Sequence, residues 1–192
     1  VRTPIGTYKG SLKEIKADQL GSIVIKEVID RSFIDKEEID GVIMGQVLTA
    51  GVGQNPARQA SINAGLSNSI PAHMVNQVCG SGLRSVISGY QTIKLNEAKY
   101  MICGGQENMS LAPFIIDRRY EKKISKKNVI DTMIYDGLID KFNNYHMGVT
   151  AENIADMYKI SRQEQDDFAY KSQTKTQLSL KKKIFDDELI AV

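Results

Sequence analysis

Apolar and polar positions alternate through residues 1–110 in a pattern that predicts helices and short buried strands in turn. Leu20, Ile23 and Val24 recur at helical spacing, for example, and give residues 17–30 one apolar face. The same pattern predicts helices over 17–30, 55–64 and 81–95 and strands over 41–48, 71–78 and 99–103. This alternation predicts a three-layer α/β arrangement in which helices cover a largely parallel sheet.

The pattern changes between Leu111 and Asn128, where arginines and lysines gather in a short stretch. We therefore place a domain boundary there and predict an N-terminal core domain over 1–112 and a second region over 113–192. In the second region, Ser161 and Glu164 have the spacing of a capping box, which predicts a helix running toward Leu180. Residues 185–192 are expected to be extended.

Composition and charge narrow the class of protein. The chain has 192 residues, 42% of them hydrophobic and 25% charged, which is ordinary for a globular protein. A net charge of +2 gives no reason to expect nucleic acid as a partner. No apolar run reaches the length of a membrane span, and no signal segment opens the chain. We expect a cytoplasmic protein that binds neither nucleic acid nor membrane.

Cys79 is the strongest candidate for chemistry. A mostly apolar run over 72–78 leads to this thiol, and the turn Gly80-Ser81-Gly82 then opens a helix. A thiol at a strand-to-helix turn lies beside unpaired backbone N–H groups and the positive end of the helix dipole, which favour the thiolate. The arrangement has the features of a nucleophile elbow built around sulfur. The alternative is a buried cysteine without chemistry, and local context leaves both open.

Five segments extend the interpretation to nearly the whole chain. They are VRTPIGT (1–7), GQNPARQ (53–59), NQVCGSG (76–82), GGQENMS (104–110) and HMGVTAEN (146–153). Their order resembles that of the thiolases, and in particular the biosynthetic acetyl-CoA C-acetyltransferases. The resemblance implies a thiolase-like layered α/β sandwich, present as its N-terminal half, with part of an inserted loop domain. In that family the residue matching Cys79 is the nucleophile that carries the acyl group.

The resemblance also implies a substrate pocket. The residues matching His146 and Met147 line the acyl-CoA pocket against the pantetheine arm, and Leu138 matches a further contact. A long, partly apolar arm suits walls of Met and Leu with one polar group to fix its orientation. Taken without the resemblance, His146 is a surface or structural histidine. Coenzyme A thioesters are the implied substrates, and neither a metal nor a nicotinamide cofactor is implied.

Other residues have structural interpretations. Cys103 ends an apolar strand and is expected to be buried, while His73 belongs to no motif and is expected to be a core or surface histidine. Arg58 is expected to be structural, and Gly104 with Gly105 to permit close packing near the helix after Cys79.

A basic cluster in the boundary region has three possible roles. It could attract the phosphates of coenzyme A or an anionic substrate, form a solvated loop, or, by the resemblance, take part in subunit assembly. Its members are Arg118, Arg119, Lys122, Lys123, Lys126 and Lys127.

Three motifs that thiolases use have no counterpart here. They are a second reactive Cys, a His in a Gly-His-Pro motif and an Asn in an Asn-Glu-Ala-Phe motif. We therefore expect this chain to contain half an active site and to be inactive alone. We expect it to form a homo-oligomer or to receive the other half from a second chain. A degradative thiolase or ketoacyl synthase is an alternative, although the segment 146–148 favours the biosynthetic branch. A truncated, non-catalytic module that binds acyl-CoA or serves in assembly is another.

Overall fold

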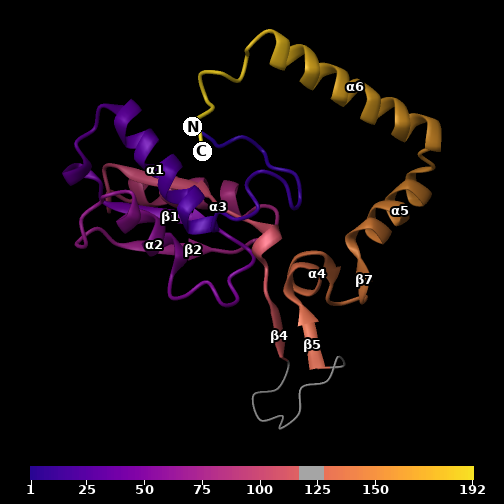
Figure 1. Ribbon diagram of the computed structural model, residues 1–192, viewed down its shortest axis with the longest axis horizontal. Helices are drawn as coiled ribbons and strands as arrows, with labels where there is room; N and C mark the ends of the chain where they lie inside the picture. Colours follow the sequence, from indigo (N-terminus) through magenta and orange to yellow (C-terminus); the bar gives the residue numbers. More distant parts are fainter. Residues whose placement is uncertain (117–127) are drawn as a thin grey trace. The chain divides into compact units, whose positions relative to one another are not determined.

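The computed structural model describes residues 1–116 and 128–192, which form two compact units. Unit 1 comprises Val1–Gly137 with Ile190–Val192, and unit 2 comprises Leu138–Leu189. The elements of unit 1 are α1 (Ala17–Ser32), η1 (Lys36–Glu38), β1 (Gly41–Gly45), α2 (Pro56–Asn63), β2 (Ala72–Val75), α3 (Ser81–Lys94), β3 (Met101–Gly105), η2 (Met109–Leu111), β4 (Phe114–Ile116), β5 (Val129–Asp131) and α4 (Thr132–Gly137) (Figure 1). Those of unit 2 are β6 (Ile139–Asp140), β7 (Tyr145–His146), α5 (Met147–Tyr158) and α6 (Arg162–Lys181).

A three-stranded parallel sheet with the order β2-β1-β3 forms the centre of unit 1. The last residue of β1, Gly45, is level with Val75 of β2 and Gly105 of β3, so the three strands end together. Every residue of β1 is buried, as expected for a central strand covered on both faces. The predicted parallel sheet is therefore confirmed.

Helices cover both faces of this sheet. On one face, Val42 and Met44 of β1 pack in a buried cluster with Ile25 of α1 and with Ala57 and Ala60 of α2. On the other face, α3 packs against β1 and β3. The three predicted layers are confirmed, and the helices predicted over 17–30, 55–64 and 81–95 form within two residues of those bounds.

The strands are shorter or shifted relative to the prediction. The strand predicted over 41–48 ends at Gly45, and the one predicted over 71–78 ends at Val75. The strand predicted over 99–103 lies at Met101–Gly105 and so includes both glycines. After β1 and β2, the N–H groups of Val47, Leu48 and Gln77 bind side chains in place of a neighbouring strand. Before β3, the N–H groups of Lys99 and Tyr100 bind the Asp40 carboxylate instead.

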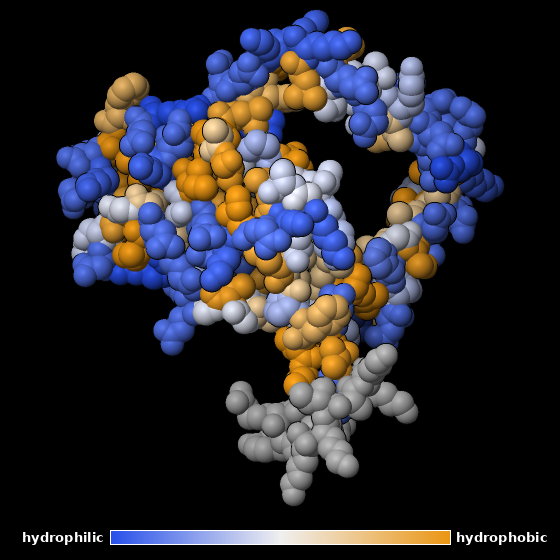
Figure 2. All heavy atoms as spheres, in the orientation of Figure 1, coloured by the Kyte–Doolittle hydropathy of each residue, from blue (hydrophilic) through white to orange (hydrophobic). Residues whose placement is uncertain are grey.

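An antiparallel pair, β4 with β5, extends from the rest of unit 1. Its side chains Phe114, Ile116 and Val129 are exposed, and Figure 2 shows hydrophobic residues gathered on this pair. The hydroxyl of Thr132, which is fully buried, donates to the carbonyl of Pro113 at 2.6 Å and fixes the base of the pair. The basic cluster predicted at 118–127 lies outside the described residues.

In unit 2, the predicted capping box is confirmed. The hydroxyl of Ser161 accepts the N–H of Glu164 at 3.2 Å, and the Glu164 carboxylate accepts the N–H of Ser161 at 2.8 Å. The predicted extended conformation is wrong for residues 185–188, which form turns. Lys183 has a left-handed conformation with a φ of 56°, which ends the helical geometry. Further along, Leu189 donates its N–H to the carbonyl of Phe185 at 3.1 Å.

The two units divide between Gly137 and Leu138, so residues 113–116 and 128–137 group with the sheet. The domains assigned from the sequence, 1–112 and 113–192, stay a prediction. None of the helices in the described segments combines the length and apolarity needed to cross a bilayer.

Candidate active site

The candidate functional residues of unit 1 lie at the carboxyl ends of the three parallel strands. Gln46 and Val47 follow β1, the segment 76–79 follows β2, and Gln106 with Glu107 follows β3. Because the strands are parallel and end in register, these segments meet at one edge of the sheet. In open α/β sheets, ligands bind outside the carboxyl ends of the strands.

Cys79 lies in the turn between β2 and α3, as the sequence predicts, and its free thiol is exposed. Asn76 begins the turn by accepting the N–H of Val78 on its side-chain oxygen at 2.9 Å. Val78, which lies beyond the end of β2, has a φ of 48°, and the chain then enters α3 at Ser81. The thiol therefore lies at a helix entrance, where backbone N–H groups and the helix dipole favour negative charge.

Two glycines allow the first turn of α3 to lie directly on the sheet. A Cβ on Gly45 would overlap the backbone of Ser81, and a Cβ on Gly105 would come within 3.3 Å of the Gly82 Cα. This backbone-to-backbone contact holds the helix entrance against β1 and β3. The expected packing role is confirmed for Gly105, whereas a Cβ on Gly104 would meet Met44 only at an ordinary 3.6 Å.

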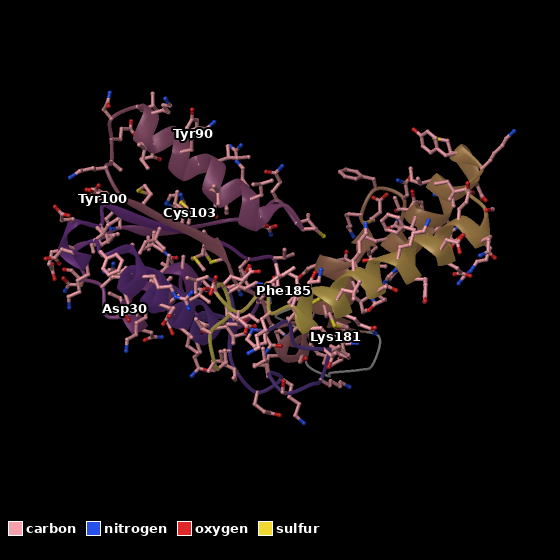
Figure 3. The ribbon with its side chains drawn as sticks, turned by 90° about the horizontal axis from the view of Figure 1, so that it is seen from above. Asp30, Tyr90, Tyr100, Cys103, Lys181 and Phe185 are labelled. Atoms are coloured by element: carbon pink, nitrogen blue, oxygen red, sulfur yellow. The ribbon has the colours of Figure 1, made fainter. Side chains whose placement is uncertain are left out.

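Small residues of α3 face the sheet, and large apolar residues face away from it. Ser81, Ser85 and Gly89 are buried, and the Ser85 hydroxyl donates to the carbonyl of Gly104 at 2.8 Å. Figure 3 shows Cys103 on the strand beneath α3 and Tyr90 on the helix. The large apolar side chains that recur at helical spacing along α3 are exposed in the described chain; they are Leu83, Val86, Ile87, Tyr90 and Ile93.

Glu107 joins two of the loops at this edge, and sequence reasoning missed it. One of its carboxylate oxygens accepts the N–H of Val47 at 2.8 Å and of Leu48 at 3.2 Å. Burial raises the pKa of the Glu107 carboxyl, although these N–H groups and that of Asn108 act in the opposite direction. The sequence signals were an acidic residue shortly after the strand predicted over 99–103 and its place in the segment GGQENMS (104–110).

A buried amide pair supports the same edge. Gln46 and Gln106 are both almost fully buried, and the Gln106 amide donates to the Gln46 side-chain oxygen at 2.9 Å. The Gln46 amide in turn donates to the carbonyl of Leu48 at 2.9 Å. Buried amide groups are costly unless they are paired, so these bonds stabilise the loops after β1 and β3. Among the described residues, the Gln106 side-chain oxygen is buried without a hydrogen-bond partner.

The three residues assigned to the substrate pocket lie together in unit 2. His146 pairs with Ile139 across β6 and β7, and Met147 donates its N–H to the carbonyl of Leu138 at 2.8 Å. The Nδ1 atom of His146 accepts the N–H of Gly148 at 3.0 Å and so caps α5. An acceptor at Nδ1 requires the proton of a neutral imidazole to be on Nε2, which is then a donor.

Cys103, Arg58 and His73 lie elsewhere in unit 1, and Cys103 is less buried than the sequence predicts. Cys103 is half-buried, and burial raises the pKa of its thiol. The Arg58 guanidinium donates to the carbonyls of Asn68 and Ile70 and ties α2 to the loop before β2. His73 is exposed on β2. Within residues 1–116 and 128–192, no group of three or more His, Cys, Asp or Glu side chains could hold a metal ion.

Comparison with known proteins identifies the class to which this fold and site belong. The whole chain, residues 1–192, matches the family model described as "Thiolase, N-terminal domain", and the chain therefore belongs to the thiolase family. It is 49% identical over 194 residues to the acetyl-CoA acetyltransferase of Syntrophomonas wolfei and 48% identical over 192 residues to that of Cupriavidus necator. It is 46% identical to a probable acetyl-CoA acyltransferase of Staphylococcus epidermidis. Each match covers 100% of this chain and 49% of the relative, so the chain spans about half the length of these curated relatives.

Proposed function

We propose that this chain supplies the nucleophile half of an acetyl-CoA C-acetyltransferase, which condenses two acetyl-CoA molecules reversibly to acetoacetyl-CoA. The observation that carries this proposal is the exposed Cys79 thiol at the entrance of α3. Its support is the membership in the thiolase family and the names of the relatives. The reaction belongs to the complete enzyme, and this chain spans about half the length of the relatives.

In the first step, the Cys79 thiolate attacks the thioester carbonyl of acetyl-CoA. The tetrahedral intermediate collapses, the C–S bond to coenzyme A breaks, and coenzyme A leaves as a thiolate that takes up a proton. The product is an acetyl thioester on Cys79. Negative charge develops on the carbonyl oxygen, and the backbone N–H of Cys79 would serve as one donor of the oxyanion hole.

In the second step, a base removes an α-proton from a second acetyl-CoA. The resulting carbanion attacks the acetyl carbonyl on Cys79 and a C–C bond forms. The C–S bond to Cys79 then breaks, which regenerates the Cys79 thiolate and releases acetoacetyl-CoA. The base and the other oxyanion donors would come from the other half of the enzyme. We therefore expect this chain alone to accept an acetyl group without completing the condensation.

For the substrate arm, we propose that Leu138, Met147 and His146 form the pantetheine contacts. Leu138 and Met147 would supply apolar walls, and the two are linked by a backbone hydrogen bond. The Nε2–H of His146, fixed by the bond at Nδ1, would donate to a polar group of the arm. No resident cofactor is needed for this chemistry, since the thioester substrate is itself activated.

The exposed apolar face of α3 favours a partner for this chain. Leu83 is 68% exposed and Tyr90 is 60% exposed, beside other large apolar side chains. Contiguous apolar surface of this kind marks an interaction site. The relatives are about twice as long as this chain, and we propose that the half they contain in addition covers this face.

The proposal is tested by adding the other half of the Syntrophomonas wolfei relative as a separate chain. We expect the mixture to cleave acetoacetyl-CoA in the presence of coenzyme A, and neither chain to do so alone. A mixture containing Cys79→Ser should be inactive, whereas one containing Cys103→Ser should keep its activity. Robust turnover by this chain alone, or a Cys79→Ser mixture with full activity, would refute the proposal.

A further inference from the structure

The residue before the candidate nucleophile has an unfavourable backbone conformation. Val78 has a φ of 48°, in the left-handed region. A β-branched side chain rarely adopts this region, because its Cβ crowds the neighbouring carbonyl oxygen. Such a conformation persists only when the surroundings enforce it.

Ser81 provides that enforcement from the first turn of α3. Its hydroxyl accepts the N–H of Gln77 at 2.9 Å and donates to the carbonyl of Val78 at 2.6 Å. Its own N–H donates to the same Val78 carbonyl at 3.1 Å. Ser81 is only 4% exposed, and its hydroxyl serves as both donor and acceptor within the turn that contains Cys79.

The Val78 peptide is also held from its other side. The side-chain oxygen of Asn76 accepts the Val78 N–H at 2.9 Å. The N–H of Gly80 donates to the carbonyl of Gln77 at 3.0 Å and closes the turn around Cys79. Ser81 is the member of this set that is anchored, because its backbone lies directly against Gly45 of β1.

We propose, building on the function proposed above, that Ser81 is a positioning residue for Cys79. Its hydroxyl holds Val78 in the left-handed conformation and thereby keeps the Cys79 thiol exposed at the entrance of α3. Without the hydroxyl, the Gln77 N–H loses its acceptor and Val78 relaxes toward a negative φ. The peptide between Val78 and Cys79 then rotates, and the thiol moves away from the helix entrance.

Alkylation of Cys79 by iodoacetamide tests this role in the full chain, with Cys103 in the same sample as an internal reference. Peptide mass spectrometry gives a rate constant for each thiol. We expect Ser81→Ala to slow alkylation of Cys79 about tenfold, the factor that corresponds to one lost hydrogen bond of ordinary strength. Ser85→Ala is the matched control, because Ser85 is buried one turn further along α3 and bonds to the Gly104 carbonyl. We expect the Cys79 alkylation rate of Ser85→Ala to stay within about twofold of wild type, even if its unfolding midpoint falls as far as that of Ser81→Ala.

A rescue experiment separates positioning from general stabilisation. Glycine adopts a left-handed conformation without strain, so Val78→Gly in the Ser81→Ala background should restore the Cys79 rate to within about threefold of wild type. Asn76→Ala removes the other hydrogen bond to Val78 from an exposed position, and we expect it to slow alkylation as well. It serves as the test variant if Ser81→Ala does not fold.

Equal rates for Ser81→Ala and Ser85→Ala, or no rescue by Val78→Gly, would overturn the positioning role. If Asn76→Ala is the test variant, an unchanged Cys79 rate would overturn it. Alkylation needs no acetyl-CoA, so the two proposals fail separately. A chain whose Cys79 is never acetylated but shows the Ser81 effect refutes only the proposed function. A chain that is acetylated but shows no Ser81 effect refutes only the positioning.

Discussion

The carboxylate of Glu107 accepts the N–H of Val47 at 2.8 Å, a contact between the loop after β3 and the loop after β1. It joins the carboxyl ends of two parallel strands at the edge of the sheet where Cys79 also lies. The same oxygen accepts the Leu48 N–H, so two backbone donors that would otherwise continue a strand are satisfied by one side chain. Glu107 thereby determines where β1 ends.

The stability of unit 1 should depend on the ionisation of Glu107. Burial raises the pKa of this carboxyl above its ordinary value of 4.5, so the folded chain binds the proton more tightly than the unfolded chain. Stability therefore falls as the pH rises through the range just above 4.5. Glu107→Gln cannot ionise, and we expect urea unfolding to show a smaller loss of stability than in wild type between about pH 4 and about pH 7.

Asp40 provides a control of opposite sign. Hydrogen bonds from the N–H groups of Tyr100 and Lys99 lower the pKa of this exposed carboxyl. The Asp40 carboxylate therefore contributes stability above its ordinary pKa, and this contribution is lost as the pH falls. We expect Asp40→Asn to lose less stability than wild type at the acid end of the pH profile. Parallel pH profiles for wild type and Glu107→Gln would contradict the role of Glu107.

Replacing Gly45 should disturb the contact between β1 and α3. A Cβ at this position would overlap the backbone of Ser81, which cannot move aside as a flexible side chain can. We expect Gly45→Ala to reduce the free energy of unfolding by about 2–3 kcal/mol. Gly104→Ala is the matched control on β3, since its Cβ would make only an ordinary contact with Met44, and it should cost less than about 1 kcal/mol. Similar losses in the two variants would argue against this contact.

The layers of the fold could be predicted from the sequence because they depend on local periodicity. The helical spacing of Leu20, Ile23 and Val24 and the continuous apolar run of β1 are visible within single segments. The strand ends could not be predicted, because they depend on contacts between distant segments. Val47 and Leu48 read as strand residues, yet their N–H groups bind a carboxylate about sixty residues later.

The candidate site was predictable in part. Cys79 was found from the Gly-Ser-Gly turn and the helix that follows it, and its place at a strand-to-helix turn agrees with the structure. The interactions that stabilise that turn could not be predicted. The left-handed conformation of Val78 and the two hydrogen bonds of the Ser81 hydroxyl leave no signal in composition or periodicity. The roles of Leu138, His146 and Met147 stay predictions.

Two substitutions at His146 separate its structural role from its proposed binding role. His146→Ala removes the cap of α5 and should destabilise that helix by about 1 kcal/mol, whereas asparagine caps a helix well and His146→Asn should not. Both variants lose the Nε2 donor, and we expect both to need more acetyl-CoA for half-maximal acetylation of Cys79. Circular dichroism measures the helix, and intact mass measures the acetylation. An Asn variant that matches wild type in both readouts would contradict the binding role.

A charge on the exposed face of α3 should block association without unfolding the chain. Leu83 is 68% exposed, so Leu83→Glu should change the free energy of unfolding by less than about 0.5 kcal/mol. In the two-chain mixture, we expect it to lower acetoacetyl-CoA cleavage at least about tenfold, because a buried unpaired charge is costly. Ile5→Glu, at an 88% exposed position in the same unit, is the control and should leave cleavage unchanged. Equal activity for both variants would exclude α3 from the contact.

The central claim is that Cys79 is the residue that takes the acetyl group, and its most direct test is the intact mass of the chain after incubation with acetyl-CoA. We predict a single acetyl adduct that maps to Cys79, is absent from Cys79→Ser and persists in Cys103→Ser. An adduct that survives in Cys79→Ser, or no adduct on a folded wild-type chain, would contradict the claim.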